Sequence, residues 1–157
     1  MKNKLKIALF IGLIFAQIII NRYVQTTKLN IDCLFLILVY ISIQSGLIKS
    51  LIWGTFIGWV TDFFIGGLVG VFGFSRTITA FFLHEFNKFF DLRKNIFVFL
   101  LIAISLAFSN LIASVFLHFI FGYKIEISLV LRQPLLTGLT GMLISSFSKI
   151  KKILDVH

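Results

Sequence analysis

The chain has 157 residues, of which 59% are hydrophobic and 13% are charged, whereas soluble domains average about 45 to 50% and about 25%. This composition excludes an ordinary soluble fold and leaves no room for a separate catalytic domain. Fifteen Lys and Arg against six Asp and Glu give a formal net charge of +9. In a membrane protein such an excess collects on the cytoplasmic side and faces anionic lipid, so it does not indicate nucleic-acid binding.

Long apolar stretches recur along the whole chain. A spanning helix needs about 20 mostly apolar residues, so we predict one all-α membrane domain over residues 1–157, a polytopic bundle of about six transmembrane helices. We expect the first stretch to be a retained helix, because no small-residue cleavage site follows it. A cluster of glycines separates the third span from the fourth. The expected spans are residues 5–20, 31–48, 51–67, 73–90, 96–121 and 129–147.

The basic residues predict an orientation. With a cytoplasmic N-terminus and six spans, the larger basic set lies inside, which favours cytoplasmic positions for both termini. The inside set is Lys2, Lys4, Lys6, Lys49, Lys88, Arg93, Lys94, Lys149, Lys151 and Lys152. The outside set is Arg22, Lys28, Arg76, Lys124 and Arg132.

Small residues recur every four positions in the third span and beyond it. Such a ridge lets two helix backbones approach closely, and this close packing drives helix association in lipid. Two interpretations stay open: packing within the bundle, or docking of another protein. The ridge consists of Gly54, Gly58, Asp62, Gly66 and Gly70.

Asp62 is the only acidic residue expected well inside a span. A charged Asp at the bilayer centre costs about 2.5 to 3.5 kcal/mol, so it needs a partner. In an antiparallel hairpin around the glycine turn, Arg76 lies at a similar depth. We therefore predict an intramembrane ion pair between Asp62 and Arg76, with Arg132 as the competing partner. Asp32, at the mouth of the second span, gives only weak support for a catalytic pair of carboxylates with Asp62.

A polar stripe on the fifth span is expected to face the bundle interior. Asn110, Ser114 and His118 follow one another at four-residue spacing, which places them on one helix face. Hydrogen-bonded packing is the favoured interpretation, because no other metal-binding side chains cluster with His118. Near the end of the fourth span, Glu85 and Lys88 have the spacing of a helical ion pair. No catalytic, cofactor-binding or metal-binding site is predicted.

Residues Asp32 to Phe90 resemble the rod shape-determining protein MreD family, whose members are small polytopic subunits of the bacterial wall-elongation machinery. The resemblance rests on the run Asp32-Cys33-Leu34-Phe35-Leu36-Ile37-Leu38-Val39-Tyr40, on Gly54 and Gly58, on Asp62-Phe63-Phe64-Ile65-Gly66 and on Gly70. It implies a non-enzymatic scaffold in the bacterial cytoplasmic (inner) membrane. The implied partners are the bitopic protein MreC, actin-like filaments and wall-synthesis enzymes.

Two other classes remain as alternatives. A substrate-binding membrane subunit of an energy-coupling-factor transporter is similar in size and helix number. It would bind a small ligand through Tyr40, Gln44, Asn110 and His118. An intramembrane hydrolase such as a lipoprotein signal peptidase ranks lower, because a second deep aspartate and polar catalytic motifs are not apparent in the sequence.

Overall fold

The structure is a computed structural model that describes residues 31–65, 70–86, 88, 94–122 and 128–154. The described residues form five α-helices and one short π-helix and contain no β-strand, which confirms the predicted all-α class. The predicted span at residues 5–20 lies outside them. The helices are α2 (Cys33–Gln44), α3 (Leu47–Ile65), α4 (Val71–Phe86), α5 (Asn95–Phe121) and α6 (Gln133–Leu154), with the π-helix η1 (Ser128–Arg132) directly before α6.

Polar and conformationally special residues set the helix ends. Asp32 caps α2, and the helix ends where Ser45 adopts an extended conformation. The stretch predicted as one span over residues 31–48 therefore turns into α3 at Leu47. Gly70, between α3 and α4, has a φ of +110°, which favours glycine because it has no Cβ. Pro134 lies in the first turn of α6, where its missing N–H is tolerated.

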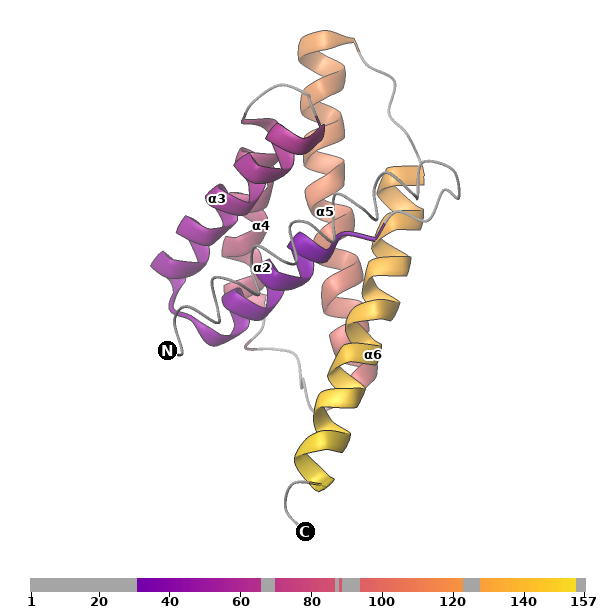
Figure 1. The fold of residues 1–157 in the computed structure, drawn as a ribbon. Coiled ribbons are helices and arrows are strands. Elements are labelled where there is room, and N and C mark those ends of the chain that lie inside the picture. Colours follow the sequence, from indigo (N-terminus) through magenta and orange to yellow (C-terminus); the bar gives the residue numbers. More distant parts are fainter. Residues whose placement is uncertain (1–30, 66–69, 87, 89–93, 123–127, 155–157) are drawn as a thin grey trace.

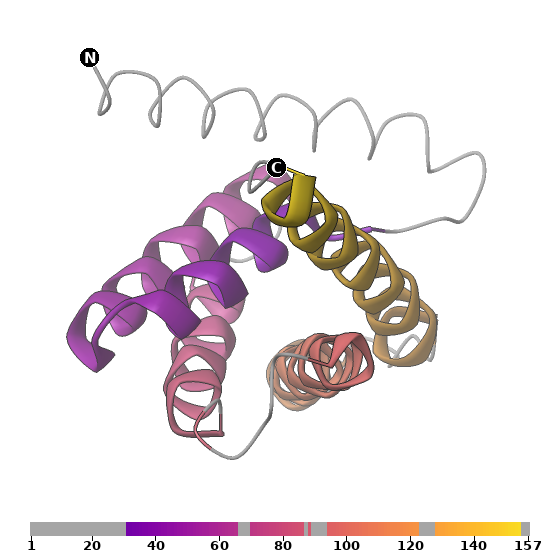
Figure 2. The ribbon, with the colours of Figure 1, turned by 90° about the horizontal axis from the view of Figure 1, so that it is seen from below.

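The helices form an arc around a central helix. Seen end on in Figure 2, α3, α4, α5 and α6 follow one another around the arc, and α2 lies on its inner side. Accordingly, α2 contacts each of the other four α-helices. Figure 1 shows that α2 begins beside α6 at about half the height of α5, and that the C-terminal end of α5 extends beyond α3 and α6.

The helix lengths explain this shape. At about 1.5 Å per residue, the 27 residues of α5 span about 40 Å, more than the roughly 30 Å hydrocarbon core of a bilayer. Helix α5 is also the one described helix long and apolar enough to cross a membrane by length and composition. The 12 residues of α2 span only about 18 Å. Helix α2 is therefore too short to run the full length of α5.

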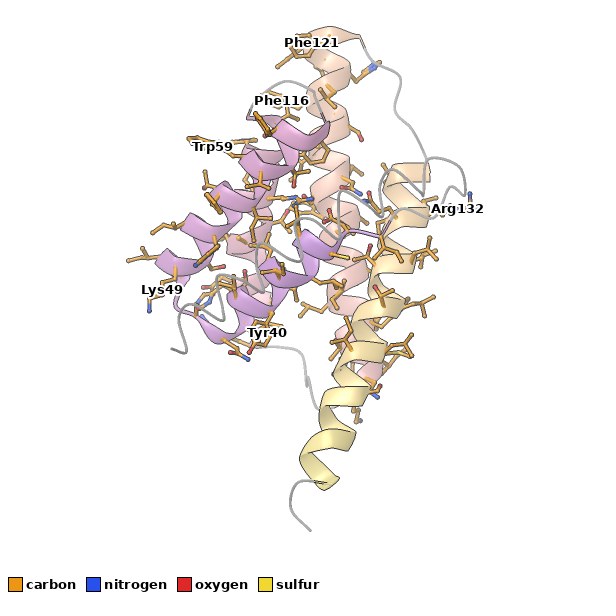
Figure 3. All side chains as sticks on the ribbon, in the orientation of Figure 1. Tyr40, Lys49, Trp59, Phe116, Phe121 and Arg132 are labelled. Carbon is orange, nitrogen blue, oxygen red and sulfur yellow. The ribbon has the colours of Figure 1, made fainter. Side chains whose placement is uncertain are left out.

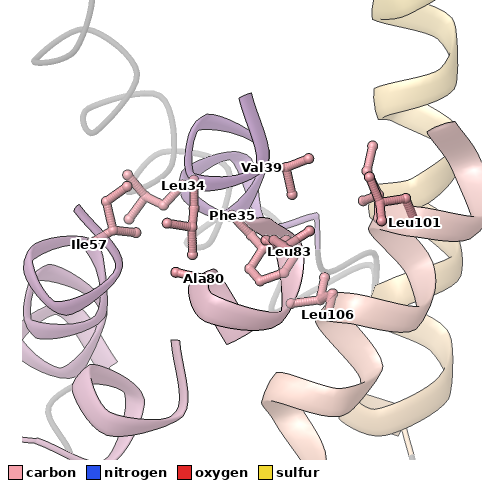
Figure 4. Close-up of a cluster of buried hydrophobic side chains, with 10 residues drawn as sticks. Leu34, Phe35, Val39, Ile57, Ala80, Leu83, Leu101 and Leu106 are labelled. Carbon is pink, nitrogen blue, oxygen red and sulfur yellow. The ribbon is translucent and has the colours of Figure 1, made fainter. Parts of the chain in front are cut away.

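Apolar side chains from four helices fill the space around α2. Figure 4 shows Leu34 and Phe35 of α2 close to Ala80 and Leu83 of α4, with Leu106 of α5 beside them. Large apolar side chains also cover the outside, as Figure 3 illustrates for Trp59, Phe116 and Phe121. Many of the buried side chains are polar, as expected of a bundle surrounded by lipid.

Candidate functional site

Asp32 joins three helices at the start of α2. It is 3% exposed. Its carboxylate Oδ1 accepts a hydrogen bond from the backbone N–H of Phe35 at 2.9 Å, which is the usual N-cap contact. Its own backbone N–H donates to Oγ1 of Thr137 in α6 at 3.0 Å. The second carboxylate oxygen, Oδ2, accepts from Nη2 of Arg76 in α4.

Arg76 is the partner of Asp32 and is itself 1% exposed. The guanidinium and the carboxylate form a buried ion pair. The guanidinium carbon also lies 5.9 Å from the ring centres of both Phe35 and Phe72, within the range of cation–π attraction. Among the residues that the structure describes, Nε and Nη1 have no hydrogen-bond partner. The charges of Asp32 and Arg76 therefore cancel, but two of the three guanidinium nitrogens of Arg76 donate no hydrogen bond to the described residues.

Asp62, 2% exposed, caps the next helix from a distance. Its Oδ2 accepts hydrogen bonds from the backbone N–H groups of Gly70 at 2.9 Å and Gly73 at 3.0 Å. Its Oδ1 accepts from the N–H of Phe72 at 2.9 Å. These N–H groups belong to the start of α4, where a helix lacks internal acceptors and carries positive partial charge. Asp62 thus connects α3 to the start of α4 through hydrogen bonds and stabilises the hairpin of the two helices.

This geometry corrects the predicted ion pair between Asp62 and Arg76, because Arg76 pairs with Asp32 instead. The reason is that backbone N–H groups already occupy both oxygens of Asp62, whereas α2 brings a second carboxylate to Arg76. From the sequence, Asp32 is expected at a helix mouth, with weak support for a catalytic pair with Asp62, and no partner is predicted for it. An Asp directly before an apolar helical run is a standard N-cap signal, and it was the available indication of this position.

Replacing Asp62 by Ala is expected to destabilise the protein by roughly 2 to 4 kcal/mol, because buried N–H groups at the start of α4 lose a charged acceptor. Asp62→Asn keeps one amide oxygen and should lose less. Thermal unfolding of the detergent-solubilised proteins measures the difference. Equal stability of the Ala variant and the wild type would contradict the capping role.

Smaller polar contacts join the remaining helices. The Ser75 hydroxyl of α4 lies 2.9 Å from the Ser109 hydroxyl of α5. Ser50 of α3 donates to the Ser42 hydroxyl of α2 at 2.7 Å. Nδ2 of Asn110 donates to Oε1 of Gln133 at 3.0 Å, which connects α5 to α6. Each of these contacts joins two different helices, so they help to fix the arrangement of the bundle.

The predicted inward polar face of α5 holds only in part. Asn110 is buried, Ser114 is half-buried, and His118 is exposed. His118 lies about two turns beyond Asn110, near the C-terminal end of α5, and Figure 1 shows that this end of the helix extends past α3 and α6. The stripe therefore continues in sequence after the neighbouring helices have ended.

The glycine ridge of α3 lies against α4. A Cβ atom on Gly58 would come within 2.4 Å of the Phe72 carbonyl oxygen and 2.5 Å of the Gly73 Cα atom. A Cβ atom on Gly54 would lie 2.8 Å from the Ala80 Cβ atom. Asp62 completes this face, whereas Gly70 lies in the turn and Gly66 falls outside the described residues. Close packing within the bundle thus occupies the described ridge inside α3 and leaves no room there for another protein.

The two buried carboxylates, Asp32 and Asp62, take part in structural contacts. Both deep carboxylates are held by structural contacts, so they do not form a pair that could share a proton or activate water. In the described part of the chain, no three His, Cys, Asp or Glu side chains are grouped so that they could hold a metal ion.

At the far end of α4, Lys88 and Glu85 form the expected ion pair, with 3.0 Å between Nζ and Oε2.

Comparison with known proteins gave a match over nearly the whole chain. The family model of the rod shape-determining protein MreD matches residues 3–147. No curated protein and no solved structure matched the chain.

Proposed function

Because the chain belongs to the rod shape-determining MreD family, we propose that it is a non-enzymatic scaffold subunit of the bacterial cell-wall elongation complex. Family membership indicates a membrane protein with a role in determining rod shape. The scaffold binds an MreC-like bitopic membrane protein. Through that partner it couples cytoplasmic actin-like filaments to the enzymes that synthesise the wall.

The use of the deep carboxylates is the observation that carries this proposal. Asp32 and Asp62 both act as helix caps, and Asp32 also neutralises Arg76. A charged residue inside the membrane normally indicates a functional site, so the group that pairs with its charge must be identified. Here the partners are other parts of the same bundle, which supports a structural role.

The outer surface supports association within the membrane. One face of α3 carries large apolar side chains that are all exposed, namely Ile48, Ile52, Phe56, Trp59 and Phe63. Their spacing of three or four residues places them along one side of the helix. Such a face suits lipid or the apolar helix of a partner. The ridge on the opposite side of α3 is already covered by α4, so partner contacts belong to the outer faces.

The proposed function also requires a particular topology. We place the chain in the bacterial cytoplasmic membrane as one multi-pass domain of six spans, with both termini in the cytoplasm. The excess of Lys and Arg in the segments assigned to the cytoplasm supports this orientation. In this topology the α3–α4 turn and Arg132 lie on the extracytoplasmic side.

A pull-down of the tagged chain from its native membrane in mild detergent tests the scaffold role. Mass spectrometry of the bound proteins is expected to detect a bitopic coiled-coil protein and wall-synthesis enzymes. A tagged membrane protein of similar size and abundance serves as the control for detergent carry-over. Recovery of paired ATPase subunits with a transmembrane coupling protein would contradict the proposal and would assign the chain to a transporter.

A further inference from the structure

The start of α2 is a helix N-terminus enclosed within the bundle. Asp32, its capping residue, is 3% exposed, and Figure 1 shows that the helix begins well below the end of α5. The N-terminus of a helix carries about half a positive charge and presents backbone N–H groups without internal acceptors. Anions bind at such positions. Asp32 satisfies one of these N–H groups, that of Phe35.

The Arg76 guanidinium lies at the same position and has unused donors. Its Nη2 donates to Asp32, whereas Nε and Nη1 are buried and find no acceptor in the described part of the chain. Most buried polar atoms in proteins have a hydrogen-bond partner, and an exception calls for an explanation such as a bound ion. The side chain is 2% exposed, so bulk water does not hydrate these donors in the closed structure.

The Phe72 ring lies beside this guanidinium. The Arg76 guanidinium carbon lies 5.9 Å from the Phe72 ring centre, and Phe72 is only half-buried. The hydrogen bond from its backbone N–H to Asp62 fixes the main chain at this point.

From these observations we propose that the start of α2 and the Arg76 guanidinium form a binding site for an oxyanion with a single negative charge, which enters when the Phe72 ring swings aside. Arg76 and Asp32 together are neutral, and the helix N-terminus adds about half a positive charge. That balance favours a monoanion over a dianion. A phosphodiester of a membrane lipid and a soluble carboxylate share this chemistry. The site is independent of the proposed scaffold function.

Thermal unfolding of the full chain in an uncharged detergent tests this site. The probes are phosphatidylglycerol, diacylglycerol with the same acyl chains as the uncharged control, and sodium acetate against sodium chloride at equal ionic strength. A site probe about 100-fold above its Kd is expected to raise Tm by roughly 5 to 10 °C. A shift with phosphatidylglycerol alone identifies a lipid source, and a shift with acetate identifies a soluble one. Equal Tm values with each probe and its control would overturn the proposal.

Three substitutions localise the effect. Arg76→Lys keeps a cation opposite Asp32 but removes Nε and Nη1, so the shift should disappear. Phe72→Ala removes the ring beside the guanidinium and should lower the midpoint concentration of the shift several-fold, whereas Phe74→Ala, an exposed ring on the same helix, should leave it unchanged. If Arg76→Lys does not fold, the midpoints of Phe72→Ala and Phe74→Ala still test whether the anion binds beside Phe72. Equal midpoints for those variants would place any binding elsewhere.

Discussion

Asp32→Asn is expected to destabilise the protein by about 3 to 5 kcal/mol, because it leaves the charge of Arg76 buried without a counter-ion. The amide keeps an oxygen that can accept the Phe35 N–H bond, so the loss reports mainly the missing charge. Arg76→Met leaves the Asp32 carboxylate uncompensated and is expected to have an effect of similar size. Chemical or thermal unfolding in a mild detergent measures both.

The double variant Asp32→Asn with Arg76→Met separates pairing from simple loss of side chains. Replacing a whole buried ion pair by uncharged groups is often nearly neutral. The double variant should therefore be more stable than either single variant. Lys88 and Glu85 provide a matched control, since their side chains are 59% and 42% exposed and the loss of such a pair costs at most about 1 kcal/mol. Additive effects of Asp32→Asn and Arg76→Met would show that the two residues do not interact.

Gly58→Ala is expected to be the most disruptive single-methyl change in the described part of α3. The added Cβ would lie 2.4 Å from the Phe72 carbonyl oxygen and 2.5 Å from the Gly73 Cα atom. These are main-chain atoms at the start of α4, which Asp62 holds in place. Helices α3 and α4 must therefore separate, at a cost of about 3 kcal/mol or more. Thermal unfolding and the yield of monodisperse protein after extraction report the effect.

Gly46→Ala is the matched control, because a Cβ atom at Gly46 would meet nothing within 4 Å. It should leave stability within about 0.5 kcal/mol of the wild type. Gly58→Leu should be worse than Gly58→Ala, since the larger side chain would project further into α4. If Gly58→Ala and Gly46→Ala behave alike, the close packing of α3 on α4 is incorrect.

The small-residue ridge of α3 could be predicted from the sequence because it depends only on the spacing of residues within one helix. Gly54 and Gly58 fall on one helix face by spacing alone, and a neighbouring helix joined by a short turn is the nearest surface to cover that face. The helix break near Gly70 was similarly apparent from the glycine cluster. The limits of α5 were close to prediction, since a long uniformly apolar run has few alternatives.

The partner of Arg76 could not be chosen by the same logic. Depth along a hairpin placed Asp62 near Arg76, but the choice between Asp62 and Asp32 depends on how α2 packs against α4, a contact between residues 44 positions apart. The predicted pair also left out the backbone N–H groups at the start of α4, which compete with Arg76 for the Asp62 carboxylate. For His118, four-residue spacing places the side chain on the face of Asn110 but does not determine its burial, and the residue is exposed.

The Asp32–Arg76 pair is a contact inside the bundle, whereas the proposed partners bind the outer faces. This arrangement is tested by the amount of bitopic partner that co-purifies per molecule of the Asp32→Asn, Arg76→Met double variant and of the wild type. Because Asp32 and Arg76 are 3% and 1% exposed, a partner does not touch them, and the ratio is expected to be unchanged at any membrane level of the variant. A double variant that accumulates like the wild type but recovers no partner would show instead that partner binding depends on this buried pair.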